Sequence, residues 1–307
     1  MALERKGVVW LDGRLVPFAD ATTHVLSHAI HYGTGVFEGL RAYRQEDGSV
    51  AVFRLREHME RLQTSAEAYR MPMPFTADQV GDAVLAVVRE NRLEDCYIRP
   101  VAFLGLGNIG VHPKECPTRV AVAAFPWGAY LGPEAIEKGV RATISSWTRL
   151  HHSMVPIAAK ACGHYLNSLL ATREAKDKGF EEAILLDRHG NVSEGAGENV
   201  FAIRDGTLRT PGLDSSILPG ITRDAAMRIA RDLGVPVVEE TLTRQDLVGA
   251  DEAFFTGTAA EITPVREIDG SVIGDGRRGP ITERIQSVFF RAVRGREPRY
   301  AEWNTRV

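Results

Sequence analysis

A stretch rich in glycine and proline, PWGAYLGPEAIEKG at residues 126–139, divides the chain into two halves. Helices and strands avoid such composition because proline lacks an amide N–H and glycine loses much conformational freedom on folding. A chain of 307 residues is long enough for two ordinary domains. We therefore predict an N-terminal domain at residues 1–127, a connector at 128–138 and a larger C-terminal domain at 139–307.

Hairpins and helices are both predicted in the first half. Asp12-Gly13 and Asp47-Gly48 each separate two apolar runs, as the turns of β-hairpins do. Residues 55–69 carry apolar side chains at helical spacing. Thr76 and Gln79 have the spacing of a capping box, which predicts a helix that ends near residue 91. Strand-like runs follow at 96–104 and 119–125.

The second half has a similar mixture of elements. A strand is predicted near 140–147, and two more at 183–187 and 199–203 on either side of a turn. Helices are predicted at 161–178, 222–233 and 281–294. Since the hairpins are segregated from the helices, we expect two α+β domains and not a long series of βαβ units.

Charge and composition exclude several kinds of partner. The formal net charge is −3 and no block of lysine and arginine occurs, so neither nucleic acid nor an anionic membrane is expected to bind. No apolar run reaches the roughly 18 residues of a membrane span, and we expect no signal peptide. The three cysteines are too few and too scattered for a disulfide framework, which favours a cytoplasmic location.

Gly105, Gly107 and Gly110 have the G-x-G-x-x-G spacing of a dinucleotide-binding turn. In that motif a helix begins at the third glycine and its N-terminus meets the pyrophosphate. Here Pro113 and Pro117 interrupt any helix after Gly110, and no acidic residue ends a strand about 20 residues further on. We predict that these glycines serve a tight loop; a nicotinamide-dependent oxidoreductase is the alternative from another functional class.

Lys160 lies among small residues in PIAAKACGHYLNS, residues 156–168. Small neighbours leave room for a bulky planar group, and apolar surroundings disfavour an ammonium ion, which makes a lysine a usable nucleophile. Pyridoxal phosphate (PLP) requires such a lysine for its Schiff base. An ordinary surface lysine is the alternative interpretation of this segment alone.

Three further segments contain groups that PLP would need. Glu194, in SEGAGEN, can place a carboxylate against the pyridine nitrogen and keep it protonated. LPGITR at 218–223 leads into a helix whose first N–H groups, with the Thr222 hydroxyl, make an anion site. TGTAAEIT at 256–263 is a second turn with phosphate-binding capacity. A solvated turn and simple helix capping are the alternatives for the first two segments.

Eight sequence blocks in order resemble the branched-chain amino-acid aminotransferases of the fold-type IV PLP enzymes. They are HYGTGVFEGLR (31–41), REHMERL (56–62), YIRP (97–100), AAFPWGAYLG (123–132), AAKACGHYLNS (158–168), SEGAGENVF (193–201), LPGITRD (218–224) and GTAAEITPV (257–265). The resemblance extends over nearly the whole chain and implies a two-domain fold of the D-amino-acid aminotransferase type.

The resemblance also implies residues that bind PLP. Lys160 matches the Schiff-base lysine and Glu194 the partner of the pyridine nitrogen. Arg61 matches an arginine that binds the phosphate, and Tyr165 a tyrosine near the phenolic oxygen of the cofactor. The remaining phosphate ligands are implied at Ile221, Thr222 and Thr258.

No metal site is expected. Substrate-binding positions are implied by the resemblance in the same way. They are Tyr32, Phe37, Tyr97, Arg99, Trp127 and Tyr130, with Ala259 as a backbone contact for the α-carboxylate. We expect Arg99 to pair with the distal carboxylate of glutamate or 2-oxoglutarate. The glycine loop is expected to reach across a dimer interface, where Ile109 and Val111 form apolar wall of the partner's pocket. The expected assembly is a homo-oligomer, either a dimer or a hexamer built from dimers.

The expected activity is transamination between leucine, isoleucine or valine and 2-oxoglutarate. D-amino-acid aminotransferase, R-selective amine transaminase and aminodeoxychorismate lyase are alternatives of the same fold that share the lysine and the glutamate. The lysine motif has Cys162 and His164 where glycine and asparagine are more common. We interpret Cys162 as a small buried residue and not as a redox group.

Overall fold

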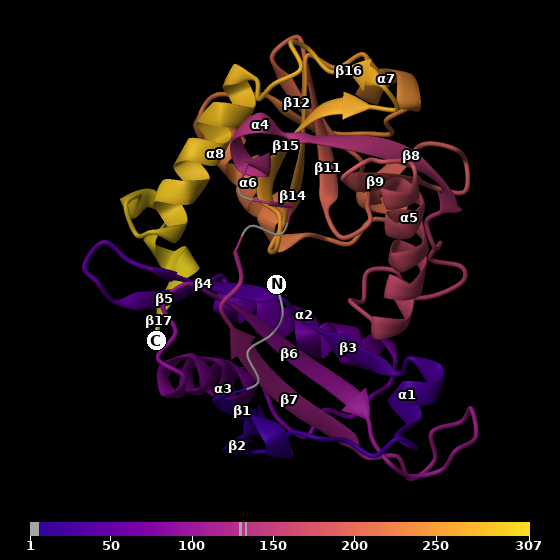
Figure 1. Ribbon diagram of the computed structural model, residues 1–307, viewed down its shortest axis with the longest axis vertical. Coiled ribbons are helices and arrows are strands. Elements are labelled where there is room, and N and C mark those ends of the chain that lie inside the picture. The colour runs from indigo at the N-terminus through magenta and orange to yellow at the C-terminus, as the bar shows by residue number, and fades with distance from the viewer. Residues whose placement is uncertain (1–5, 129–130, 133) are drawn as a thin grey trace. The chain divides into compact units, whose positions relative to one another are not determined.

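The computed structural model describes residues 6–128, 131–132 and 134–307 (Figure 1). Residue contacts divide these residues into two compact units. The first contains the described residues up to Trp127 together with Ala159–Gly163 and Ala292–Val307; the second contains those of Gly128–Ala158 and His164–Arg291. The described residues of the predicted connector, 128–138, belong to the second unit, and two segments predicted in the C-terminal domain, 159–163 and 292–307, belong to the first. Both contact the first unit through strand pairing, which sequence position does not reveal.

The first unit is built on an antiparallel sheet that contains eight strands among the described residues. The strand order is β17-β5-β4-β6-β7-β1-β2, and β3 also pairs with β6. Asp12-Gly13 and Asp47-Gly48 connect β1 to β2 and β4 to β5, so both predicted hairpins are present. The strands are β1 (Val8–Leu11), β2 (Arg14–Pro17), β3 (Gly35–Phe37), β4 (Leu40–Arg44), β5 (Val50–Phe53), β6 (Cys96–Leu104), β7 (Thr118–Phe125) and β17 (Asn304–Arg306).

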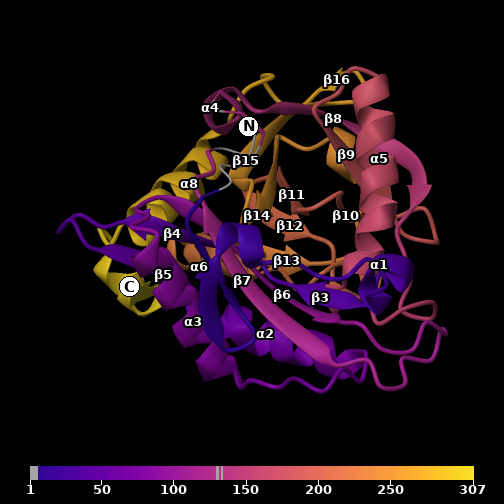
Figure 2. The same cartoon turned by 60° about the horizontal axis from the view of Figure 1, so that its bottom comes forward.

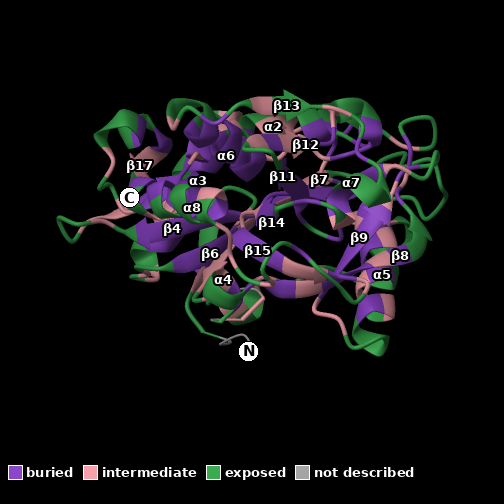
Figure 3. Cartoon of the chain, turned by 90° about the horizontal axis from the view of Figure 1, so that it is seen from above, coloured by how far each residue is buried: buried purple, intermediate pink, exposed green. Residues whose placement is uncertain are grey.

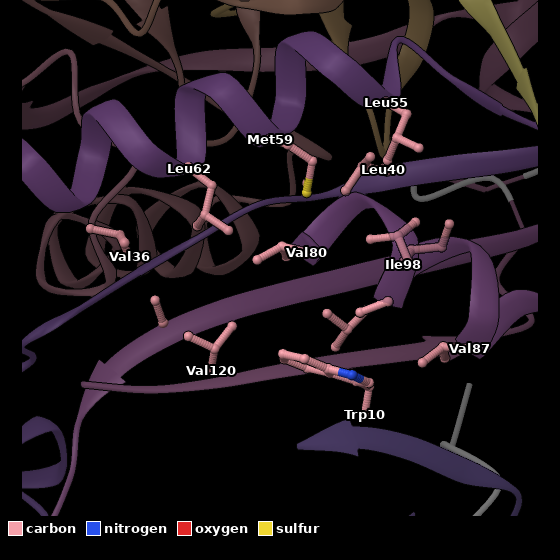
Figure 4. Close-up of a cluster of buried hydrophobic side chains, with 14 of the residues drawn as sticks. Trp10, Val36, Leu40, Leu55, Met59, Leu62, Val80, Val87, Ile98 and Val120 are labelled. Carbon is pink, nitrogen blue, oxygen red and sulfur yellow. The ribbon is translucent and has the colours of Figure 1, made fainter. Parts of the chain in front are cut away.

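Two helices, α2 (Leu55–Ala68) and α3 (Ala77–Glu90), pack on this sheet and enclose its core. Thr76 and Gln79 form the predicted capping box at the start of α3. Figure 4 shows Met59 and Leu62 of α2 pointing toward Leu40 and Val80, and all four side chains are buried. Burial of each large aliphatic side chain contributes about 1.5–3 kcal/mol, which holds α2 in a fixed position against the strands.

The second unit contains a mixed sheet of nine strands within the described residues. The order is β10-β9-β8-β15-β14-β11-β12-β13, β16 pairs with β15, and β8 runs parallel to both neighbours. Figure 3 shows β14 and β15 coloured largely as buried. The strands are β8 (Val140–Thr148), β9 (Glu182–Leu186), β10 (Val192–Gly195), β11 (Asn199–Arg204), β12 (Thr207–Thr210), β13 (Val237–Glu239), β14 (Glu252–Gly257), β15 (Glu261–Ile268) and β16 (Ser271–Val272).

The helices of the second unit lie near the predicted positions, with one late start. α5 packs on β8 and β9 (Figure 2), whereas α6 packs on β14 and β15. α5 begins at Tyr165, not at residue 161, because Ala161 pairs with Val36 and Cys162–His164 form a 3-10 turn. One short strand that the sequence did not predict, β10, pairs with β9. These helices are α4 (Ala135–Lys138), α5 (Tyr165–Asp177), α6 (Ile221–Asp232), α7 (Arg244–Val248) and α8 (Pro280–Val293).

Together the two sheets and their helices confirm the predicted α+β class. A further short helix, α1 (His28–Tyr32), precedes β3 in the first unit. In the part of the chain that the structure describes, we find no helix with the length and apolar character that crossing a bilayer requires.

Replacement of Glu182 with glutamine is expected to stabilise the protein above neutral pH. Glu182 begins β9 and is 1% exposed, and this burial raises the pKa of its carboxyl group to about 7. A carboxyl whose folded pKa lies above its unfolded value loses stability as pH rises between the two values. The gain for Glu182→Gln is therefore expected to reach about 3 kcal/mol at about pH 8 and to vanish below about pH 4. Urea unfolding of both proteins across this range measures it; equal stabilities at about pH 8 would contradict the expectation.

Candidate active site

Lys160 is held in the first unit by strand β3 and helix α2. Its carbonyl oxygen accepts a hydrogen bond from the Phe37 N–H (3.0 Å), and its own N–H donates to Ser65 Oγ on α2 (3.0 Å). The ammonium nitrogen lies 5.2 Å from the centre of the Phe37 ring. The backbone of the lysine is thus attached to two packed elements, while its side chain meets an aromatic face.

Four predicted substrate residues form a connected cluster, namely Phe37, Tyr97, Arg99 and Trp127, and Phe37 is the member that faces Lys160. The Arg99 guanidinium carbon lies 4.6 Å from the Phe37 ring centre and 5.1 Å from that of Tyr97. Arg99 Nη2 donates to the Tyr97 hydroxyl (2.9 Å), and the Tyr97 and Trp127 rings pack edge to face at 4.6 Å. This arrangement combines aromatic walls with one fixed cation, so it can accept an apolar side chain and a carboxylate.

Two further residues, neither of which has a role predicted from the sequence, support this cluster. Arg41 Nη1 donates to the Trp127 carbonyl (3.1 Å), so it ties the end of β7 to β4. Gly39 leaves room for Tyr97, because a Cβ atom at residue 39 would lie 2.0 Å from the Tyr97 hydroxyl oxygen. Both residues lie inside the block HYGTGVFEGLR, but only the tertiary contact shows what they do.

Arg61, the predicted phosphate ligand, makes a two-point ion pair with Glu38. Its Nε and Nη2 atoms lie 2.7 Å and 2.9 Å from the two carboxylate oxygens. His58, one turn before it on α2, places Nδ1 2.7 Å from Glu38 Oε2. The Glu38 and His58 side chains are 0% and 1% exposed. A forked pair of this kind fixes the plane of a guanidinium, and with it the directions of its remaining N–H groups.

The charge states in this network follow from burial and neighbours. Burial alone would raise the pKa of Glu38, but Arg61 and His58 hold that pKa well below its usual value. Burial lowers the pKa of His58, against the opposing influence of Glu38. The network therefore contains an ionised carboxylate, a guanidinium and a neutral imidazole that donates from Nδ1. A sequence signal existed, since His58 and Arg61 are three residues apart and share one face of α2.

Glu194 is buried in the second unit and accepts hydrogen bonds from three other segments. Arg149 Nη2 lies 2.7 Å from Oε1, while Asn199 Nδ2 and the Leu218 N–H lie 3.1 Å and 3.0 Å from Oε2. The residue is 4% exposed. A carboxylate that is oriented and charge-compensated in this way can act as a fixed anionic partner for a cationic ring nitrogen.

The start of α6 lies beside this carboxylate. Asn199 Nδ2 also donates to the Leu218 carbonyl (2.9 Å), and its Oδ1 occupies the space where a side chain at Gly220 would begin. α6 starts at Ile221, followed by Thr222, and its cap residue Gly220 makes no side-chain capping bond. N–H groups of a first helical turn that no side chain caps are suited to bind an anion.

Thr258 and Ala259 lie in the turn between β14 and β15. α6 packs against both of these strands. The two predicted phosphate-binding segments, 218–223 and 256–263, therefore belong to elements that contact each other.

Tyr165 is the first residue of α5 and is half-buried. Tyr130, a predicted substrate residue, lies outside the described residues.

Residues 105–117 form a loop and contain no helix, so the helix of a dinucleotide-binding motif is missing there. Gly107 is needed for packing, because a Cβ atom there would lie 2.4 Å from the Glu115 carbonyl oxygen. α1 anchors the loop: the Tyr32 hydroxyl donates to the Ile109 carbonyl (2.7 Å), and His28 Nε2 donates to the Gly110 carbonyl (3.0 Å). Ile109 and Val111 remain 58% and 77% exposed.

Cys162 is partly buried, whereas the sequence predicts a buried residue, and it packs within the first unit. Its sulfur lies 3.1 Å from the position of a Cβ atom at Gly35, so it fills space beside β3. Burial raises the pKa of its thiol, which keeps the sulfur protonated and unreactive. His164 is buried at the end of the 3-10 turn that leads into α5.

Comparison with known proteins identifies the family. The family model described as amino-transferase class IV matches residues 35–268. The chain belongs to this family. The branched-chain-amino-acid aminotransferase of Escherichia coli (strain K12) is 52% identical to this class IV aminotransferase over 291 residues, which are 94% of each chain.

Two solved structures resemble this class IV aminotransferase closely. A crystal structure of the Escherichia coli branched-chain amino acid aminotransferase has a TM-score of 0.95 and 50% identity, and covers 98% of this chain and 99% of its own. The branched-chain amino acid aminotransferase from Thermobaculum terrenum in its PLP-form has a TM-score of 0.92 and 37% identity, with 99% of each chain covered. These matches confirm the predicted family and its fold.

Proposed function

We propose that this class IV aminotransferase transfers the amino group of L-leucine, L-isoleucine or L-valine to 2-oxoglutarate with PLP as cofactor. The products are a branched-chain 2-oxo acid and L-glutamate. The observation that carries the proposal is the cluster of Phe37, Tyr97 and Trp127 with Arg99 beside Lys160. The high identity to enzymes named for this activity supports it.

The donor set of the chain fits PLP. When bound, the cofactor supplies a carbonyl carbon that reacts with amines and a conjugated ring that accepts the electrons of the Cα–H bond. Lys160 would provide the amine that holds the cofactor and, once the amine of the substrate has replaced it, would take and return the proton at Cα of the substrate. Glu194 would hold the ring nitrogen in its protonated form, and Tyr165 would stabilise an ionised phenolic oxygen. The phosphate is assigned to Arg61, Ile221, Thr222 and Thr258.

The pocket residues account for two kinds of substrate. Aromatic walls bury a branched aliphatic chain and gain about 25 cal/mol for each Å² of apolar surface removed from water. Arg99 pairs with the distal carboxylate when glutamate or 2-oxoglutarate binds, and the backbone at Ala259 binds the α-carboxylate. Because both substrates react in turn at one site, the kinetics are expected to be ping-pong.

A homo-oligomer and a cytoplasmic location complete the proposal. The exposed Ile109 and Val111 give the anchored loop an apolar surface that a second copy of the chain would cover. We assign to this loop the role of a wall in the partner's substrate pocket, and to Tyr32 the role of its support. All three cysteines are free thiols, as in reducing compartments.

Activity toward a panel of amino donors with 2-oxoglutarate tests this function. We expect L-leucine, L-isoleucine and L-valine to be used at rates well above those of their D-enantiomers and of R-amines. The purified protein is expected to be yellow, and borohydride reduction to fix the cofactor on Lys160. Preference for a D-amino acid, or a colourless protein that binds a nicotinamide, would overturn the proposal.

Substitution of Gly39 with alanine is expected to lower kcat/KM for L-leucine by about 10²-fold. The added methyl group would overlap the Tyr97 hydroxyl, so the ring must leave its contacts with Arg99 and Trp127, and a displacement of about 1 Å is enough for a loss of this size. Gly81→Ala is the control, since a Cβ atom there would lie 3.8 Å from Met59, in ordinary contact. A Gly39→Ala variant with the wild-type kcat/KM would disprove the role of Gly39.

A further inference from the structure

Arg149 is a buried arginine that none of the assigned roles uses. It follows β8, and its N–H donates to the Leu186 carbonyl at the end of β9 (2.8 Å). Its side chain is 8% exposed and meets Glu194 Oε1 through Nη2 at 2.7 Å. Its Nε atom has no hydrogen-bond partner among the described residues. Burial of a guanidinium is costly, so the position requires a compensating function or a compensating partner.

Of the three donors to Glu194 described above, Arg149 is the one that carries a charge. Asn199 and the Leu218 N–H are neutral donors, and both bind the other carboxylate oxygen, Oε2. Burial disfavours the charged form of a carboxylate, and neutral donors oppose this effect less strongly than a charged donor does. A guanidinium in direct contact opposes this and keeps the carboxylate ionised.

We propose that Arg149 is a positioning residue that keeps Glu194 ionised and correctly oriented, so that the proton stays on the ring nitrogen of PLP. This inference rests on the proposed function. In a buried site, a carboxylate beside a protonated ring nitrogen can take that proton and leave both groups neutral. The charge of Arg149 acts most strongly on the carboxylate that it contacts, so it favours the ion pair over the neutral pair. A ring that keeps its proton accepts electrons better than a neutral one.

Nitrogen NMR of the holoenzyme tests this inference. PLP labelled with ¹⁵N in the ring is bound to the wild type and to Arg149→Met, and the ring-nitrogen shift reports whether the proton is present. We expect a protonated nitrogen in the wild type and a shift toward the unprotonated value in Arg149→Met. We also expect kcat for L-leucine to fall at least tenfold while KM changes less than threefold.

Three other variants separate the charge of Arg149 from its packing. Arg149→Lys keeps the charge and is expected to retain the protonated signal, whereas Arg149→Gln keeps a donor but not the charge and is expected to lose it. Arg149→Gln also serves if Arg149→Met fails to fold. Arg209→Met is the control for loss of an ion-paired arginine elsewhere in the same unit, since Arg209 pairs with Glu240 at 2.7 Å; its side chain is 37% exposed, and its Nε likewise has no partner among the described residues.

The possible results distinguish this inference from the proposed function. The inference is wrong, and Arg149 has only a structural role, if the ring nitrogen keeps the shift of its protonated form in Arg149→Met and Arg149→Gln. It is also wrong if Arg209→Met changes that shift as much as the Arg149 variants do. If the wild type binds no PLP, the proposed function itself fails. Loss of the signal in both uncharged variants, with retention in Arg149→Lys and Arg209→Met, supports the inference.

Discussion

Replacement of Lys160 with alanine is expected to reduce transamination by roughly 10⁴-fold or more. The variant lacks both the amine that reacts with the cofactor and the group that moves the proton between Cα and C4′. The main-chain N–H and carbonyl of residue 160 bond to Ser65 and Phe37, and alanine keeps both of these hydrogen bonds. The fold is therefore expected to persist, with an unfolding temperature close to that of the wild type.

Steady-state rates with L-leucine and 2-oxoglutarate measure the loss. Lys178→Ala is the control, because Lys178 lies on the surface at the end of α5 and pairs with Glu174 (2.6 Å). Its activity is expected to match that of the wild type. Borohydride treatment should attach the cofactor covalently to the wild type and to Lys178→Ala, but not to Lys160→Ala. Full turnover by Lys160→Ala would exclude Lys160 as the catalytic amine.

Replacement of Glu38 with glutamine is expected to lower the free energy of unfolding by about 3–5 kcal/mol. The change removes the charge that compensates Arg61 and one acceptor of the buried network, whose third member is His58. Because Glu38 is fully buried, water cannot replace the lost interaction. Urea unfolding at neutral pH gives the free energy, and an unchanged slope indicates that the variant exposes the same amount of surface on unfolding.

Glu60→Gln provides the comparison for this loss. Glu60 pairs with Arg56 at 2.8 Å on α2, the helix that also carries Arg61, but the side chains of Glu60 and Arg56 are exposed. Exposed pairs contribute about 0–1 kcal/mol, so this variant is expected to change stability little. If Glu38→Gln were no more destabilised than Glu60→Gln, the buried network would contribute nothing to stability.

Acid should reduce the difference between Glu38→Gln and the wild type. The pKa of Glu38 is lowered in the folded state, so its stabilising contribution is complete above the unfolded value of 4.5 and declines as pH falls below it. The pKa of His58 is also lowered, so the unfolded state takes up a proton there first as pH falls through 6.5. The His58 effect destabilises both proteins in acid, whereas the Glu38 effect acts on the wild type alone and therefore reduces the difference. Both effects are the reverse of the pH dependence predicted from Glu182.

Local sequence patterns determined the elements and the type of chemistry. The hairpins at Asp12-Gly13 and Asp47-Gly48 and the capping box at Thr76 depend on residues only a few positions apart, so their conformation follows from local interactions. The sequence blocks around Lys160 and Glu194 indicated the family, which comparison with known proteins confirmed. The roles of the individual site residues stay predictions.

Only the tertiary structure decided which groups compensate the buried charges. Glu38 pairs with Arg61, which is 23 positions away in sequence. Arg149, which follows β8, pairs with Glu194 in β10. The strand β17 joins β5 from the far end of the chain in the same way. Local spacing contains no information about such partners, because they come together only when apolar burial brings distant segments into one packed unit. The sequence by itself therefore determined the kind of enzyme, and the packing determined how its charged groups are oriented and kept ionised.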